Sequence, residues 1–199
     1  MTPFLRSTAV LDWQVPDVRA QADRLKGTDN VKTARNCFEW VRDQIQHSSD
    51  HGLETVTCSA SNVLAQGSGF CYAKSHLLAA LLRANGIPAG FAYQRLSLGD
   101  GRFCLHGLNA VWLPTGDWYR IDARGMKPGL VAEFTPPVER LPFDCTGPGE
   151  RLFPSIWADP LPIVVEALTS FRRVSDLLLN LPDTEEPGRL AAEGSVMKP

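Results

Sequence analysis

A cysteine follows a glycine-rich turn in residues 67–82, GSGFCYAKSHLLAALL, and the residues after it predict a buried helix. Cys71 would then lie at a helix N-terminus, where free backbone amides and the aligned peptide dipoles stabilise a thiolate, the nucleophilic form of cysteine. Gly67 and Gly69 would let the backbone approach a substrate and leave amides free as an oxyanion hole. Cys71 is therefore a candidate nucleophile. The alternative is a buried, inert cysteine.

A nucleophilic cysteine needs a proton acceptor, and the chain has four histidines. His47 and His51 lie in a polar segment and are expected to be solvated. His76 follows Cys71 by five positions, which turns it away from the thiol on a helix. His106 lies in FCLHGLNAVWL, whose apolar residues predict a core strand. A buried imidazole needs hydrogen-bond partners, so His106 is the candidate base. The alternative is a core histidine with its hydrogen bonds satisfied.

Asp122 ends the predicted strand WYRIDA. If residues 114–117 form a hairpin turn, Asp122 falls within about two residues of the position across from His106. The strand register decides whether the two side chains share a face. A carboxylate at this place would hold the imidazole in one tautomer and stabilise its charged form. The alternative is an aspartate that caps a turn at a strand end.

Cys104 and His106 alternate along one strand, which would put both on the same face. A metal site built on this pair is another interpretation of the same residues. The sequence holds no further closely spaced pair of ligand residues, so we expect neither a metal nor a cofactor.

The elements that would position these residues follow from hydrophobic periodicity. Apolar residues recur at three- and four-residue steps in the first half of the chain, which favours helices. These helices are predicted at residues 16–25, 30–46, 59–64 and 71–84. The pattern then changes to strands separated by turn residues, at residues 87–98, 102–113 and 118–123. Helices followed by an antiparallel meander indicate an α+β fold.

A single domain is expected over residues 1–181 of the 199-residue chain. Residues 125–153 are rich in proline and glycine and predict an irregular cover. Within it, Phe134 and Phe143 could wall a cleft, or they could pack for stability alone. Residues 160–181 are predicted to contain a C-terminal helix, and residues 182–199 predict a flexible tail.

Two stretches, GSGFCYAKSHLLAALLRANGIPAG and HGLNAVWLPTGDWYRIDAR, resemble the transglutaminase-like superfamily of cysteine acyl-transfer enzymes. The resemblance extends over about residues 30–125. It implies a papain-like α+β core in which the cysteine-bearing helix packs on an antiparallel sheet. It also implies a catalytic triad of Cys71 as nucleophile, His106 as base and Asp122 as the residue that orients the base.

Residues beside the triad depart from those of some relatives. Relatives often carry an aromatic and an acidic residue where this chain has Leu108 and Ala110. Phe70 and Tyr72 replace the Gln and Trp that flank the cysteine of the animal crosslinking enzymes. We therefore expect a protease or amidase that works through a thioester, rather than a protein-crosslinking enzyme. A catalytically inactive binding domain of the same fold is the alternative.

Composition limits the partners. A formal net charge of -2 argues against nucleic acid and anionic membranes as partners. The longest apolar run, residues 77–82, is too short to cross a bilayer. The N-terminal residues show no signal-peptide pattern, and the five cysteines are scattered, so a cytoplasmic location with reduced thiols is expected. The expected partner is a peptide or a small amide or acyl substrate. The sequence predicts neither the substrate's identity nor the oligomeric state.

Overall fold

The computed structural model describes residues 1–190 and 196–197. Its helices are η1 (Thr2–Leu5), α1 (Pro16–Arg24), α2 (Asn30–Gln44), α3 (Ala60–Gln66), α4 (Cys71–Ala84), α5 (Pro162–Ser170), α6 (Val174–Leu179) and η2 (Pro187–Leu190). Its strands are β1 (Gln46–His47), β2 (Ser68–Gly69), β3 (Ala89–Ser97), β4 (Phe103–Trp112), β5 (Trp118–Ile121), β6 (Arg151–Leu152), β7 (Ile156–Trp157) and β8 (Val196–Met197). In the described part of the chain, no helix has both the length and the apolar character needed to cross a membrane.

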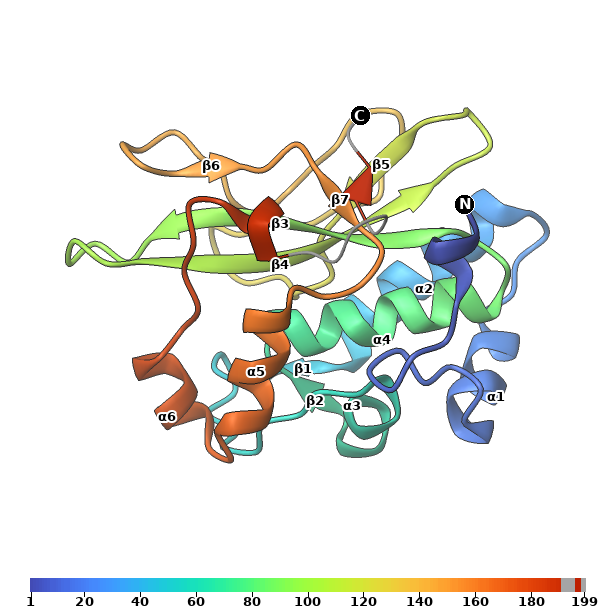
Figure 1. Cartoon of the computed structure of the whole chain (residues 1–199). Helices are drawn as coiled ribbons and strands as arrows, with labels where there is room; N and C mark the ends of the chain where they lie inside the picture. Colours follow the sequence, from blue (N-terminus) through green and yellow to red (C-terminus); the bar gives the residue numbers. More distant parts are fainter. Residues whose placement is uncertain (191–195, 198–199) are drawn as a thin grey trace.

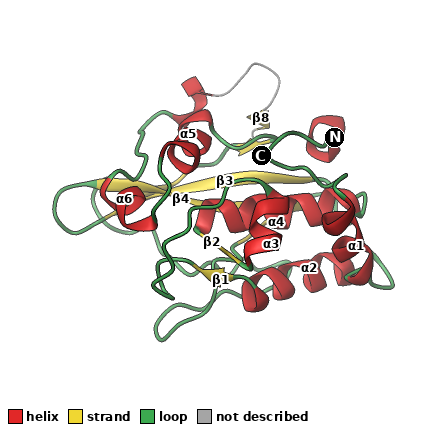
Figure 2. Cartoon of the chain, turned by 90° about the horizontal axis from the view of Figure 1, so that it is seen from below, coloured by secondary structure: helices red, strands yellow, loops and turns green. Residues whose placement is uncertain are grey.

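The main sheet has the strand order β5-β4-β3-β7-β8, and β6 also pairs with β3. All of its pairs are antiparallel. Helix α4 lies directly against the long strands β3 and β4 (Figure 1). Seen from below, α1 to α4 lie together on this side of the sheet (Figure 2). This arrangement confirms the predicted α+β fold, with the cysteine-bearing helix packed on an antiparallel sheet.

Helix α4 is the centre of the core, because all of its residues are buried. Its two buried cationic side chains donate to backbone carbonyls, which satisfies their hydrogen-bonding groups away from water. Lys74 donates to the carbonyls of Arg42 and Ile45 at the end of α2. Arg83 binds the carbonyls of Arg6, Ala89 and Ala158 and so joins the end of α4 to β3 and the chain after β7.

Residues 160–181 contain helical structure, as predicted, in the form of two short helices, α5 and α6. Between them the chain is extended and pairs with residues 54–56. The amide of Val56 donates to the carbonyl of Arg172 at 3.2 Å, and the amide of Val174 donates to the carbonyl of Glu54 at 2.8 Å. These long-range hydrogen bonds keep the chain between α5 and α6 extended. The local hydrophobic periodicity gives no sign of them. The short strands β6, β7 and β8 were also not predicted.

The segment after α6 returns to the sheet. The amide of Leu105 donates to the carbonyl of Pro182 at 2.7 Å, and Arg95 binds both carboxylate oxygens of Asp183 at 2.7 and 2.8 Å. Residues 182 and 183, at the start of the predicted tail, therefore have defined contacts. Within the rest of the predicted tail, η2 and β8 are described. Residues 191–195 and 198–199 lie outside the described residues.

Candidate active site

Cys71 is the first residue of α4 and is 4% exposed. No side chain caps this helix N-terminus. The amides of its first turn have no partner within the helix, so they are available to an anion at the thiol. Gly67, before Cys71, has a structural role instead. Gly67 ends α3 in the left-handed conformation, with φ of 63°, and its amide donates to the carbonyl of Val63. The expectation that the Gly67 amide is free for an oxyanion is therefore wrong.

Hydrogen bonds between α4 and β4 fix the position of Cys71 relative to His106. The Tyr72 hydroxyl donates to the carbonyl of Leu105. Ser75 donates to the carbonyl of Gly107 at 3.2 Å, and Asn109 donates to the carbonyl of Ser75 at 3.0 Å. The β4 residues in these contacts, Leu105, Gly107 and Asn109, alternate along the strand and lie on both sides of His106. The contacts hold the strand that carries the imidazole against the first turns of the helix that carries the thiol.

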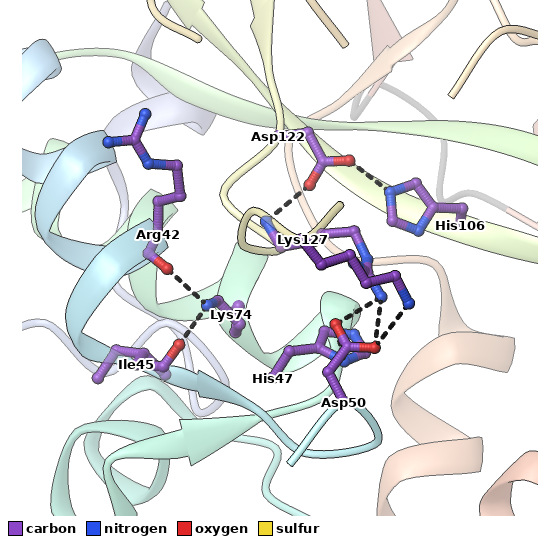
Figure 3. A network of polar contacts seen from close by, with 9 residues as sticks. Arg42, Ile45, His47, Asp50, Lys74, His106, Asp122 and Lys127 are labelled. Carbon is purple, nitrogen blue, oxygen red and sulfur yellow. Dashed lines mark hydrogen bonds and ion pairs between the residues drawn. The ribbon is translucent and has the colours of Figure 1, made fainter. Parts of the chain in front are cut away.

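His106 and Asp122 form a buried pair in which His106 Nε2 lies 2.5 Å from Asp122 Oδ2 (Figure 3). Asp122 is 1% exposed, and its Oδ1 accepts from the amide of Arg124 at 2.9 Å. Asn109 on β4 pairs with Ile121 on β5, so Asp122 lies diagonally from His106, a placement that the predicted hairpin permits and the observed register supplies. Because Nε2 faces the carboxylate, Nδ1 is the ring nitrogen left to meet the thiol.

The charge state of His106 follows from these neighbours. Burial favours the neutral imidazole. The charges of Asp122 and of the Cys71 thiolate, together with hydrogen bonds to both side chains, outweigh burial and raise the pKa of His106 to about 10. The site thus favours a protonated imidazole beside the Asp122 carboxylate. An imidazolium so placed can deliver a proton to a leaving group.

A cleft of about 240 Å³ opens onto Cys71 and His106. Phe143 lines it and meets the His106 ring edge-on, with the ring centroids 4.8 Å apart. Its place in the cleft wall agrees with the prediction. Phe134 does not line the cleft and belongs to the core, where it packs on Phe38 and Tyr119. The interpretation of Phe134 as a cleft wall is therefore wrong, and packing for stability holds for it.

Of the other histidines, His47 departs most from its prediction. It is 5% exposed, lies on β1 and packs against Phe70, with the ring centroids 5.1 Å apart. Burial, together with the charge of Arg124, lowers the pKa of His47 to about 3, so the ring is neutral at physiological pH. His51 is exposed, as predicted. Sequence reasoning missed His47 because a two-residue parallel pairing buries it, and so short a strand has no readable period.

The geometry around Cys104 and His106 does not favour a metal site. Cys104 lines the same cleft as Cys71 and His106. Across residues 1–190 and 196–197, no group of three or more His, Cys, Asp or Glu side chains is arranged to hold a metal ion. Because His106 Nε2 is already bonded to Asp122, the described residues favour a proton-transfer pair over a metal pair.

Residues 19–123, just over half of the chain, match the family described as the transglutaminase-like superfamily. The chain belongs to the transglutaminase-like superfamily. A comparison with curated proteins finds no match.

Among solved structures, the chain is similar to a “putative cysteine protease” from Cytophaga hutchinsonii, with 21% identity and a TM-score of 0.50. That match covers 62% of this chain and 41% of the other. The periplasmic domain of TgpA from Pseudomonas aeruginosa is similar at 21% identity, with a TM-score of 0.45 over 61% of this chain and 45% of that one. The chain thus spans less than half the length of either structure. The first likeness supports the transglutaminase-like fold.

Proposed function

We propose that this protein is a cysteine hydrolase that cleaves peptide or other amide bonds through a thioester on Cys71. One observation carries the proposal. The buried imidazole of His106 is hydrogen bonded through Nε2 to Asp122 and lines the same cleft as Cys71, whose charge contributes to the raised pKa of His106. A nucleophile, a base and a residue that orients the base are the minimum needed for acyl transfer.

The chemistry follows from the positions of these groups. The Cys71 thiolate attacks the carbonyl carbon, and the oxyanion that forms accepts hydrogen bonds from the free amides at the start of α4. The His106 imidazolium gives its proton to the leaving amine, which departs and leaves an acyl group on sulfur. His106, now neutral, takes a proton from water as the water attacks the thioester. The acid product leaves, and the thiolate–imidazolium pair is restored. Asp122 keeps the ring oriented throughout.

Hydrolysis is favoured over protein crosslinking because Phe70 and Tyr72 flank Cys71 where the animal crosslinking enzymes carry Gln and Trp. Tyr72 is fully buried against β4, and Phe70 packs between His47 and Tyr72. The likeness to a “putative cysteine protease” supports the same choice. The cytoplasmic location expected from the sequence stays a prediction.

The proposal is tested with a mixed library of short peptides and peptide amides, whose cleavage is followed by mass spectrometry. The wild-type protein is compared with Cys71→Ala and with a matched control, Cys58→Ala, whose thiol does not line the cleft. We expect cleavage by the wild type and the control, and a loss of about 10³-fold or more in Cys71→Ala. Adding a primary amine to the reaction detects any transamidation.

Two outcomes would overturn the proposal. One is cleavage that survives in Cys71→Ala. The other is a folded wild-type protein that binds library peptides but converts none of them, which would establish the inactive binding domain instead.

A further inference from the structure

A second cavity adjoins the cleft. It has a volume of about 620 Å³ and lies between the end of α2, the segment after β1 and residues 124–128. His47 and Arg124 line both this cavity and the cleft that holds Cys71. Arg124 therefore lies at the boundary between the two spaces and lines the same cleft as Cys71.

Arg124 is buried but only partly satisfied. It is 7% exposed, and its Nη2 binds the two carboxylate oxygens of Asp50 at 3.1 and 2.9 Å. Its Nη1 is buried and has no hydrogen-bond partner among the described residues. The guanidinium carbon lies 5.6 Å from the ring centroid of Phe143, a wall of the cleft. A buried guanidinium with an unused N–H is costly to keep unless a ligand completes it.

The surroundings of Arg124 leave a positive charge unbalanced. Asp50 is shared, because it also binds Lys127 at 3.0 Å and faces His47 Nδ1 at 3.5 Å (Figure 3). The other aspartate that lines the larger cavity, Asp43, is held by Nε and Nη2 of Arg42. Four basic side chains (Arg42, Lys74, Arg124 and Lys127) and two aspartates, Asp43 and Asp50, line the larger cavity, so an incoming anion would lower the positive charge there.

We infer that Arg124 binds a carboxylate of the substrate beside Cys71, so that this protein selects acyl donors that carry one. The inference rests on the proposed function, because it names the substrate class of the same site. A planar guanidinium with a free N–H matches a carboxylate in geometry as well as in charge. The carboxylate can come from an acidic side chain near the scissile bond or from the free C-terminus of a peptide. Both sources present the same chemistry to Arg124.

The test measures binding of four peptides by titration calorimetry to the full chain carrying Cys71→Ala, which prevents turnover. The first pair is acetyl-Ala-Glu-Ala-amide and acetyl-Ala-Gln-Ala-amide. The second pair is acetyl-Ala-Ala-Ala as the free acid and as the amide. We expect at least one carboxylate peptide to bind about tenfold or more tightly than its neutral counterpart. Preference in the first pair assigns the carboxylate to a side chain, and preference in the second assigns it to a chain end.

Three further variants in the same background locate the effect. Arg124→Gln should bring the affinity ratio to about one, and Arg124→Lys should lose most of it because an ammonium lacks the fork. Arg24→Gln, which makes the same charge change on exposed α1, should keep the ratio. If Arg124→Gln does not fold, as judged by thermal unfolding, Arg124→Lys decides the question alone.

Equal affinities within both pairs, or a preference that survives loss of the Arg124 fork, would overturn the inference. Because binding is measured without turnover, its failure is separate from failure of the proposed function. A protein that hydrolyses neutral and acidic peptides equally loses only the carboxylate subsite. A protein that binds carboxylates through Arg124 but never cleaves loses only the hydrolase.

Discussion

The ring of Tyr72 packs directly on Gly107: a Cβ at Gly107 would lie 2.8 Å from Tyr72 Cδ1. These two residues are the immediate neighbours of Cys71 and His106. The approach of helix α4 to strand β4 is therefore set at the residues next to the proposed nucleophile and base. Only glycine permits this approach without a shift of helix or strand.

Gly107→Ala should consequently damage both stability and activity. Tyr72 is confined by its hydrogen bond to Leu105, so the helix must move to admit the methyl group. We expect the free energy of unfolding to fall by about 1–3 kcal/mol. We also expect kcat/KM to fall by about tenfold or more, because small misplacements of reacting groups are costly. Urea unfolding and peptide hydrolysis measure the two effects. Gly188→Ala is the control, since nothing lies within 4 Å of its added Cβ, and a comparable loss there would contradict this explanation.

Asp122→Asn tests the charge on His106. With a pKa of about 10, His106 stays protonated far above the 6.5 of a free imidazole. The alkaline limb of the kcat/KM profile should therefore lie near pH 10. In Asp122→Asn we expect this limb at lower pH and a rate reduced by about 10² to 10⁴. A limb near 6.5 in the wild type would refute the imidazolium assignment.

The same pair affects folding stability. His106 binds its proton more tightly in the folded state, so its stabilising contribution is present below pH 6.5 and is lost as the pH rises toward 10. Unfolding in urea at pH 6 and pH 10 measures this contribution. Relative to Asp122→Asn, the wild type should lose more stability over that interval, and parallel behaviour of the two proteins would count against the pair.

Phe143 and Phe134 should respond differently to truncation. Phe134→Ala removes a fully buried ring, so we expect unfolding to become easier by about 3–5 kcal/mol, with little change in activity of the folded fraction. Phe143→Ala leaves the core intact, and we expect a stability change within about 1 kcal/mol. It should lower activity about tenfold, because water then reaches the His106–Asp122 pair. The result would be inconsistent with the structure if Phe134→Ala reduced activity selectively.

Much of this site could be predicted from the sequence, for identifiable reasons. The helix after Cys71 is long, apolar and followed by Asn85 and Gly86, so its bounds are locally encoded. The turn at residues 114–117 fixes the hairpin register, which is why Asp122 falls near His106. The helix bounds and the hairpin turn are each encoded by residues that are close together in the sequence.

The residues that sequence analysis missed depend on long-range contacts. Nothing in the local sequence distinguishes Arg124 as a buried residue. Its place in the structure depends on an ion pair with Asp50, which is 74 positions away in the chain. Phe143 and Phe134 occupy the same irregular segment without any period to separate them. His47 is buried by pairing with a segment more than twenty residues later. No local pattern encodes such contacts.

Arg83 offers a test of how α4 is held. Its guanidinium donates to carbonyls from three separate segments, at Arg6, Ala89 and Ala158, so Arg83→Met should lower the free energy of unfolding by about 2–4 kcal/mol. Urea unfolding measures the change. Arg24→Met on exposed α1 is the control and should stay within about 0.5 kcal/mol. Equal effects of the two substitutions would show that the buried contacts of Arg83 add no stability.

The proposal that His106 activates Cys71 as a nucleophile is tested most directly by the rate at which iodoacetamide alkylates each cysteine. Peptide mass spectrometry measures this rate across about pH 5 to 9. The wild type is compared with His106→Ala. Burial raises the pKa values of the other thiols, to about 12 for Cys37 and Cys104 and about 11 for Cys58, so they and Cys145 serve as internal controls. We expect Cys71 to react fast even near pH 5 and His106→Ala to remove this advantage. Alkylation of Cys71 at the rate of the other four, or a rate that does not depend on His106, would contradict the proposal.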